Sequence, residues 1–207
     1  MKQTLAGLFA IAWCLLLTAG PARSEILAVE PGVSVTLPDD WERADSGFAS
    51  ANAEVARIFD CATGDPGQIK TLGWKTGSDG KVIAAFCISY QGSGIGKVRN
   101  LLKTSKDKER EAVAAKFLDS FAGKLKSEYV KRKMKVADLS ADLLEAGDGF
   151  VVVMDGKIAD GAATLMNAST IYIQGDGLLR ISFVYRGSTP PSVVEQLDAI
   201  PLSVDWR

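Results

Sequence analysis

Apolar and polar residues alternate in some segments of the chain, and in others the apolar residues return every three or four positions. Alternation over 33–37 ends at Pro38-Asp39-Asp40, which predicts a half-buried strand followed by a turn. Residues 50–59 carry apolar side chains on or near one helical face and are expected to form a short helix. The strongest helical pattern covers 105–130, where the apolar residues recur every four positions: Val113, Phe117, Phe121, Leu125 and Tyr129.

The other segments with a clear pattern are mostly extended. The segments 69–75 and 81–91 predict two strands joined by a glycine-containing turn, and the C-terminal third predicts three more, at 150–154, 165–174 and 178–185. Gly175-Asp176-Gly177 predicts a tight hairpin between the last two, and Pro190-Pro191 opens a short final helix. Runs of neighbouring strands interrupted by one long and two short helices indicate an α+β fold, with helices packed on an antiparallel sheet.

The first 24 residues have the pattern of a cleavable signal peptide. Lys2 precedes an apolar stretch over 5–18, and the small residues Ala22 and Ser24 favour cleavage before Glu25, with cleavage after Ala22 as a nearby alternative. The apolar stretch is short for a retained membrane anchor, and Trp13 before Cys14 disfavours a lipoprotein. We expect a mature chain, 25–207, that is periplasmic or secreted and has no transmembrane segment.

The mature chain is expected to form a single α+β domain, 25–207, because its size suits one well-buried core. It keeps two cysteines, Cys61 and Cys87. Exported proteins meet oxidising conditions, so the pair predicts a disulfide that stabilises the fold by roughly 3 kcal/mol in the chain-entropy model. Two buried thiols that never meet are the alternative.

The chain contains no histidine. This absence excludes serine–histidine and cysteine–histidine catalysis and histidine-ligated zinc. The glycines before Lys97 do not complete a phosphate-binding loop, because Gln91 and Val98 occupy positions where that motif needs glycine and a hydroxyl. We therefore assign no catalytic, cofactor-binding or metal-binding residue, and we expect no cofactor.

Basic residues concentrate in one part of the chain. Residues 97–135 hold 13 basic and five acidic residues, while the mature chain as a whole is acidic. Such asymmetry is typical of a surface for an anionic partner, here represented by Lys124, Lys126 and Lys131. A helix that is simply solvated is the alternative, because the lysines spread around much of the helix circumference. Nucleic acid is not expected as a partner of an exported, acidic chain without interleaved aromatic residues.

One short motif resembles a known family. The run Val35-Thr36-Leu37-Pro38-Asp39-Asp40-Trp41 is similar to the early strand of Mog1/PsbP-like domains, and the hairpin ending in 181–185 before a terminal helix is similar to their end. The resemblance implies an α/β/α sandwich around an antiparallel sheet. That family has no single activity, so the resemblance implies no catalytic residue.

These observations favour an exported, non-enzymatic binding or accessory domain that contacts an envelope component or another protein. An inhibitor or immunity protein for a secreted toxin is a specialised form of the same hypothesis. The alternative from another class is a small hydrolase or isomerase that uses lysine and carboxylates, which requires such a residue in a pocket with a shifted pKa.

Overall fold

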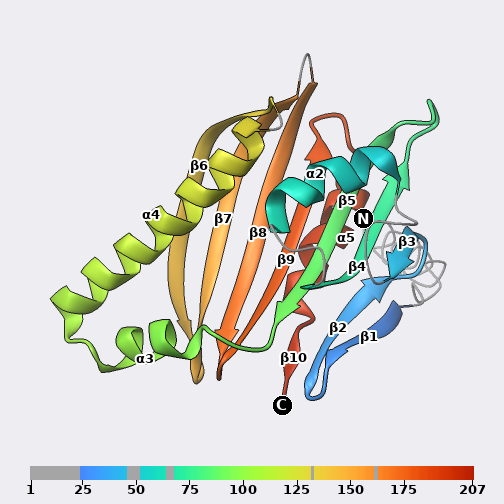
Figure 1. The fold of residues 1–207 in the computed structure, drawn as a ribbon. Helices are drawn as coiled ribbons and strands as arrows, with labels where there is room; N and C mark the ends of the chain where they lie inside the picture. Colours follow the sequence, from blue (N-terminus) through green and yellow to red (C-terminus); the bar gives the residue numbers. More distant parts are fainter. Residues whose placement is uncertain (1–23, 46–51, 64–67, 132, 161–162) are drawn as a thin grey trace, which may run out of the picture.

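The computed structural model describes residues 24–45, 52–63, 68–131, 133–160 and 163–207 (Figure 1). Its main element is a seven-stranded sheet in which all neighbours are antiparallel. In spatial order the strands are β3 (Glu42–Asp45), β4 (Ile69–Thr76), β5 (Val82–Gln91), β9 (Gly177–Arg186), β8 (Ala163–Gln174), β7 (Gly149–Asp160) and β6 (Lys135–Ala146). A smaller antiparallel sheet has the order β1 (Ser24–Glu30), β2 (Val33–Pro38) and β10 (Asp205–Trp206).

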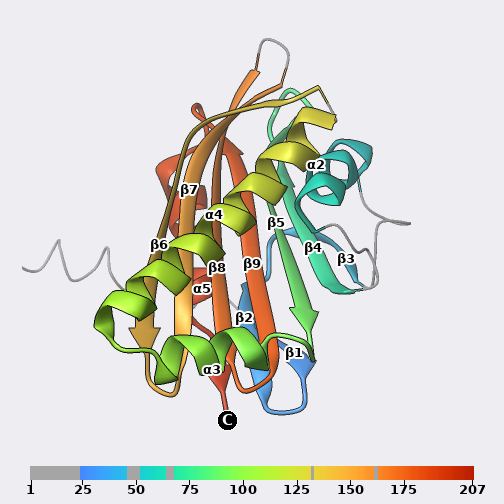
Figure 2. The same cartoon turned by 60° about the vertical axis from the view of Figure 1, so that its left-hand side comes forward.

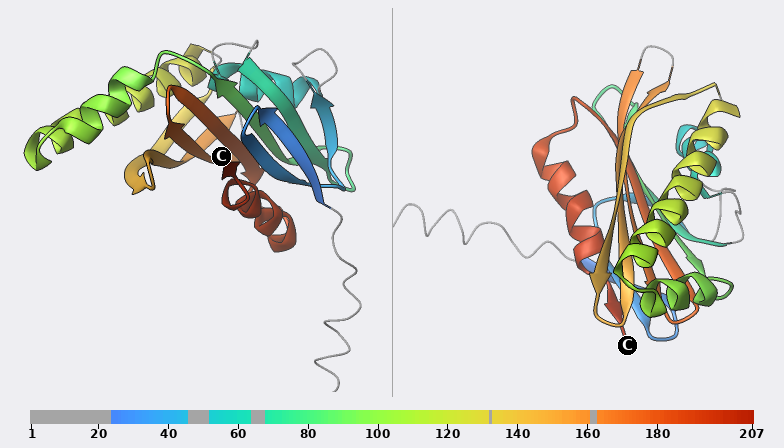
Figure 3. Two further views of the ribbon diagram at one scale, coloured as in Figure 1. Left: turned by 90° about the horizontal axis from the view of Figure 1, so that it is seen from below. Right: turned by 90° about the vertical axis from the view of Figure 1, so that its left-hand side faces the viewer.

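Helices lie on both faces of the large sheet. Figure 2 shows α2 (Ala53–Thr63), α3 (Gly96–Thr104) and α4 (Asp107–Lys131) on one face. The other face carries α5 (Pro191–Leu202) and the small sheet, and the edge-on view in Figure 3 separates the layers. The expected α+β class with helices packed on an antiparallel sheet is therefore confirmed.

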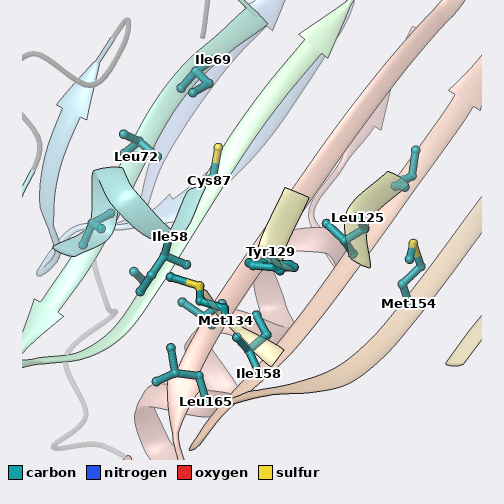
Figure 4. Close-up of a cluster of buried hydrophobic side chains, with 14 of the residues drawn as sticks. Ile58, Ile69, Leu72, Cys87, Leu125, Tyr129, Met134, Met154, Ile158 and Leu165 are labelled. Carbon is teal, nitrogen blue, oxygen red and sulfur yellow. The ribbon is translucent and has the colours of Figure 1, made fainter. Parts of the chain in front are cut away.

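Alternation along the central strands creates a separate core on each face. In β5, Ala85 and Cys87 belong to the cluster under α2 and α4, whereas Phe86 and Ile88 belong to the cluster under α5. Successive side chains of a strand point to opposite faces, so one strand that is apolar throughout supplies both cores. Figure 4 shows part of the first cluster, with Leu125 and Tyr129 of α4 above the sheet.

The expected strands, the long helix and the final helix are all present, with small shifts at their ends. The hairpin at Gly175 is confirmed, since Gln174 pairs with Gly177 and Gly175 adopts the positive φ of 59° that such a turn needs. Five elements were not predicted: β1, β3, α3, β6 and β10. In the described residues, no helix combines the length and apolar character that a membrane span requires. Residues 1–23, which hold nearly all of the expected signal peptide, lie outside them.

Candidate functional site

Two residues near the start of the basic segment form ion pairs. At its start, Lys103 of α3 pairs with Asp148, and Arg110 of α4 lies 2.5 Å from Glu145. The hydrogen bond and charge of Lys103, with a smaller effect of Arg99, lower the pKa of Asp148 below its usual value. Lys103 and Arg110 in this part of the segment therefore have carboxylate partners near the β6–β7 turn.

The C-terminal end of α4 is different. Lys124, Lys126 and Lys131 are all exposed, whereas Leu125 and Tyr129 between them are buried against the sheet. No ion pair holds Lys124 or Lys126 in the described part of the chain. Exposed Lys133 and Lys135 follow directly after the helix.

An apolar side chain stands among these lysines. Val130 is 64% exposed, one of the few large apolar side chains that the fold leaves in solvent. It lies one turn after Lys126 on α4, on a side of the helix turned away from the core. We define the basic end of α4 as Lys124, Lys126, Val130 and Lys131. It combines positive charge with one apolar contact point.

A buried polar cluster beneath α4 was not foreseen. Arg180 is 7% exposed, its Nε donates a 2.9 Å hydrogen bond to Ser182 Oγ, and its guanidinium lies 5.4 Å from the centre of the Phe121 ring. Burial lowers the pKa of Arg180. Arg180 lies within the apolar segment 178–185, which was predicted to be a strand. A charged residue in such a segment indicates a buried polar contact, because arginine is rarely buried without partners. The cluster joins α4 to β9 and stabilises the helix against the sheet.

Of Cys61 and Cys87, the structure describes the side chain of Cys87 alone. Cys87 is a free, buried thiol on β5, and burial raises its pKa to about 12. The structure therefore does not show the predicted disulfide. Cys61 belongs to α2, which packs on β5, but its side chain lies outside the described residues. The pairing stays a prediction.

Carboxylates gather on the face of β6 and β7 that α4 does not cover. Burial first, and then the charges of Asp142 and Asp198, raise the pKa of Asp155 above its usual value. Burial, Asp198 and Asp155 likewise raise the pKa of Tyr185 on β9. Lys157 of β7 lies 3.8 Å from Asp138 of β6. Within the described residues, no group of three or more histidine, cysteine or acidic side chains is placed to hold a metal ion.

Comparison with known proteins gives information on the fold alone. No protein-family model matches the sequence, and no curated protein sequence matches it. The solution structure of cyanobacterial PsbP (CyanoP) from Synechocystis sp. PCC 6803 is similar, with a TM-score of 0.55 and 9% identity over 92% of this chain and 96% of that one. The fold is PsbP-like, as the strand-Pro-Trp motif implied.

Two further structures are more distant. A protein from Bacteroides thetaiotaomicron has a TM-score of 0.49 and 12% identity over 91% of this chain and 49% of its own. LpqN, a protein involved in cell envelope biogenesis of Mycobacterium tuberculosis, has a TM-score of 0.46 and 8% identity over 88% of this chain and 90% of its own.

Proposed function

We propose that the mature chain is a non-enzymatic accessory domain, periplasmic or secreted, that contacts an anionic envelope component or an acidic protein through the basic end of α4. The observation that carries the proposal is the exposure of Lys124, Lys126 and Lys131 around Val130. Lys124 and Lys126 differ from Lys103 and Arg110 near the start of the segment, which pair with carboxylates near the β6–β7 turn. Lysines near an anionic lipid surface contribute about 1 kcal/mol each.

The export half of the proposal rests on the signal-peptide pattern of 1–24 and on the PsbP-like domain that follows it. Strand β1 begins at Ser24, beside the expected cleavage point, and its Glu25 pairs with Arg43 of β3. N-terminal sequencing of the protein from periplasm or medium should give Glu25, or Arg23 for the nearby alternative. Retention of Met1 in a membrane fraction would contradict export with cleavage.

Co-sedimentation with vesicles containing phosphatidylserine tests the contact surface. Wild-type protein should bind at low salt and be released at higher salt, because the Debye length falls to about 8 Å at 0.15 M. The triple variant Lys124→Glu, Lys126→Glu, Lys131→Glu should bind at least about 100-fold more weakly, since three lysine contacts of about 1 kcal/mol are lost.

A matched control keeps the same change in net charge. Lys97, Lys108 and Lys116 are also exposed, and Lys116 stands about 12 Å from Lys124 along the helix axis. That separation takes these lysines out of direct contact with a vesicle bound at the basic end of α4, so their replacement by glutamate should weaken binding at low salt less than the change at 124, 126 and 131 does. Equal loss in both triple variants, or no binding of the wild type at low salt, would overturn the proposed surface.

A further inference from the structure

A groove lies between β2 and α5. Figure 3 shows these two elements on the opposite side of the large sheet from α4. Its volume is about 450 Å³, within the range of small-molecule pockets. Leu37 and Pro38 line it from β2, and Ala199 and Ile200 line it from α5. The walls are therefore largely apolar, and two consecutive carboxylates, Asp39 and Asp40, lie at the turn that closes one end.

Polar groups within the groove are mostly occupied by the protein itself. Ser203 Oγ accepts a 2.9 Å hydrogen bond from the Thr36 amide, and its hydroxyl lies 2.7 Å from the carbonyl oxygen of Ile200. The Oε1 atom of Gln196 accepts from the Trp41 indole at 2.9 Å. A polar occupant would find few unused partners along these walls, whereas an apolar one displaces only water.

The charged residues that line the groove are negative. Of the described residues that line it none is basic, and two are acidic. Lys75 Nζ lies 2.5 Å from Asp40, and the nearby Arg43 is held by Glu25, so the adjoining cations already have carboxylate partners. Asp39 forms no ion pair among the described residues, although its charge helps to raise the pKa of the nearby Arg43.

We propose that this groove binds a small amphipathic cation, with its apolar chain between Pro38 and Ala199 and its ammonium group at Asp39. Apolar walls supply affinity through burial of the chain, and the carboxylate selects a positive head group over a negative one. This site is separate from the basic end of α4, and the two prefer ligands of opposite charge.

Calorimetric titration with three probes of one chain length tests the assignment: octylammonium, 1-octanol and octanoate. Affinity should decrease in that order at low salt. Asp39→Asn should lower affinity for octylammonium about two- to fivefold, the range of an exposed ion pair, and leave 1-octanol unchanged.

Filling the groove supplies the structural control. Ala199 is exposed, so Ala199→Trp should occupy the groove without disturbing the core and should abolish binding of all three probes. Ala115→Trp, on an exposed position of α4, should leave binding as in the wild type. Octanoate binding as tightly as octylammonium, or octylammonium binding that survives Ala199→Trp, would overturn the proposal. Vesicle binding by Ala199→Trp should be unchanged, which separates this test from that of α4.

Discussion

Trp41 donates a 2.9 Å hydrogen bond from its indole Nε1 to the Oε1 atom of Gln196, and so ties the turn after β2 to α5. The indole is 5% exposed, and its ring centre lies 5.3 Å from that of Phe86 on the central strand β5. Lys75 of β4 covers the ring at 5.7 Å. Trp41 therefore packs into the core, and three separate elements meet at this one side chain.

Trp41→Ala should lower the free energy of unfolding by roughly 3–5 kcal/mol, because it leaves a large cavity in the core under α5. Trp41→Phe keeps most of the apolar volume and loses mainly the bond to Gln196, so it should cost less. Urea denaturation followed by circular dichroism measures both. A loss below about 1 kcal/mol for Trp41→Ala would contradict the anchoring role.

Two glycines make a contrasting pair. A Cβ at Gly149 would lie 2.1 Å from the Ile173 carbonyl oxygen, whereas a Cβ at Gly123 in α4 would meet no atom within 4 Å. Gly149→Ala should destabilise by about 1–3 kcal/mol through overpacking. Gly123→Ala should stabilise by about 0.5–1 kcal/mol, since glycine is unfavourable inside a helix. Thermal unfolding should move in opposite directions for the two variants.

The raised pKa of Asp155 predicts a pH-dependent stability. The folded state holds this proton more tightly than the unfolded state, so stability falls as pH rises above the ordinary aspartate pKa of about 3.9. Asp155→Asn should therefore raise the melting temperature at pH 7 and have little effect at pH 3. Asp119→Asn, at an exposed position of α4, is the control. An equal gain from Asp155→Asn at both pH values would show that the carboxylate's charge is not the cause.

The thiol of Cys87 should be unreactive in the folded protein. Burial raises its pKa to about 12, so the thiolate that reacts with iodoacetamide is scarce at pH 8, and the side chain is 1% exposed. Labelling of native protein should be negligible at this residue, as mass spectrometry of the peptide would show.

Labelling after unfolding without reductant tests the predicted Cys61–Cys87 bond. A disulfide predicts no labelled thiol in exported protein, and Cys87→Ser should then cost a few kcal/mol. Two labelled thiols per chain would rule the bond out.

Elements with one buried face were predictable from the sequence. The four-residue spacing over 105–130 located α4, since Leu125 and Tyr129 do face the core. Strand β6 was missed because it is an edge strand with mostly exposed or half-buried residues, and a bulge near Asp138, which has a φ of 53°, interrupts its alternation. Strand β1 was missed because it begins at Ser24, the residue at which the expected signal peptide ends.

The candidate sites depend on contacts that spacing cannot show. Sequence alone placed Lys124, Lys126 and Lys131 on the long helix, but it could not show that Lys103 and Arg110, earlier in the segment, pair with the carboxylates at 148 and 145. The groove joins Pro38 to Ala199, residues far apart in the chain that become neighbours only when α5 packs beside β2. Such pairings follow from the topology of the fold.

Photocrosslinking from Val130 in the native cell envelope tests the central claim most directly. With p-benzoylphenylalanine in place of Val130, irradiation should give an adduct with an anionic lipid or an acidic protein, and glutamate at 124, 126 and 131 should remove it. The same photoreactive residue at Ala115, also exposed on α4, should give no such adduct. The absence of an adduct from Val130, or equal adducts from both positions, would contradict a contact through the basic end of α4.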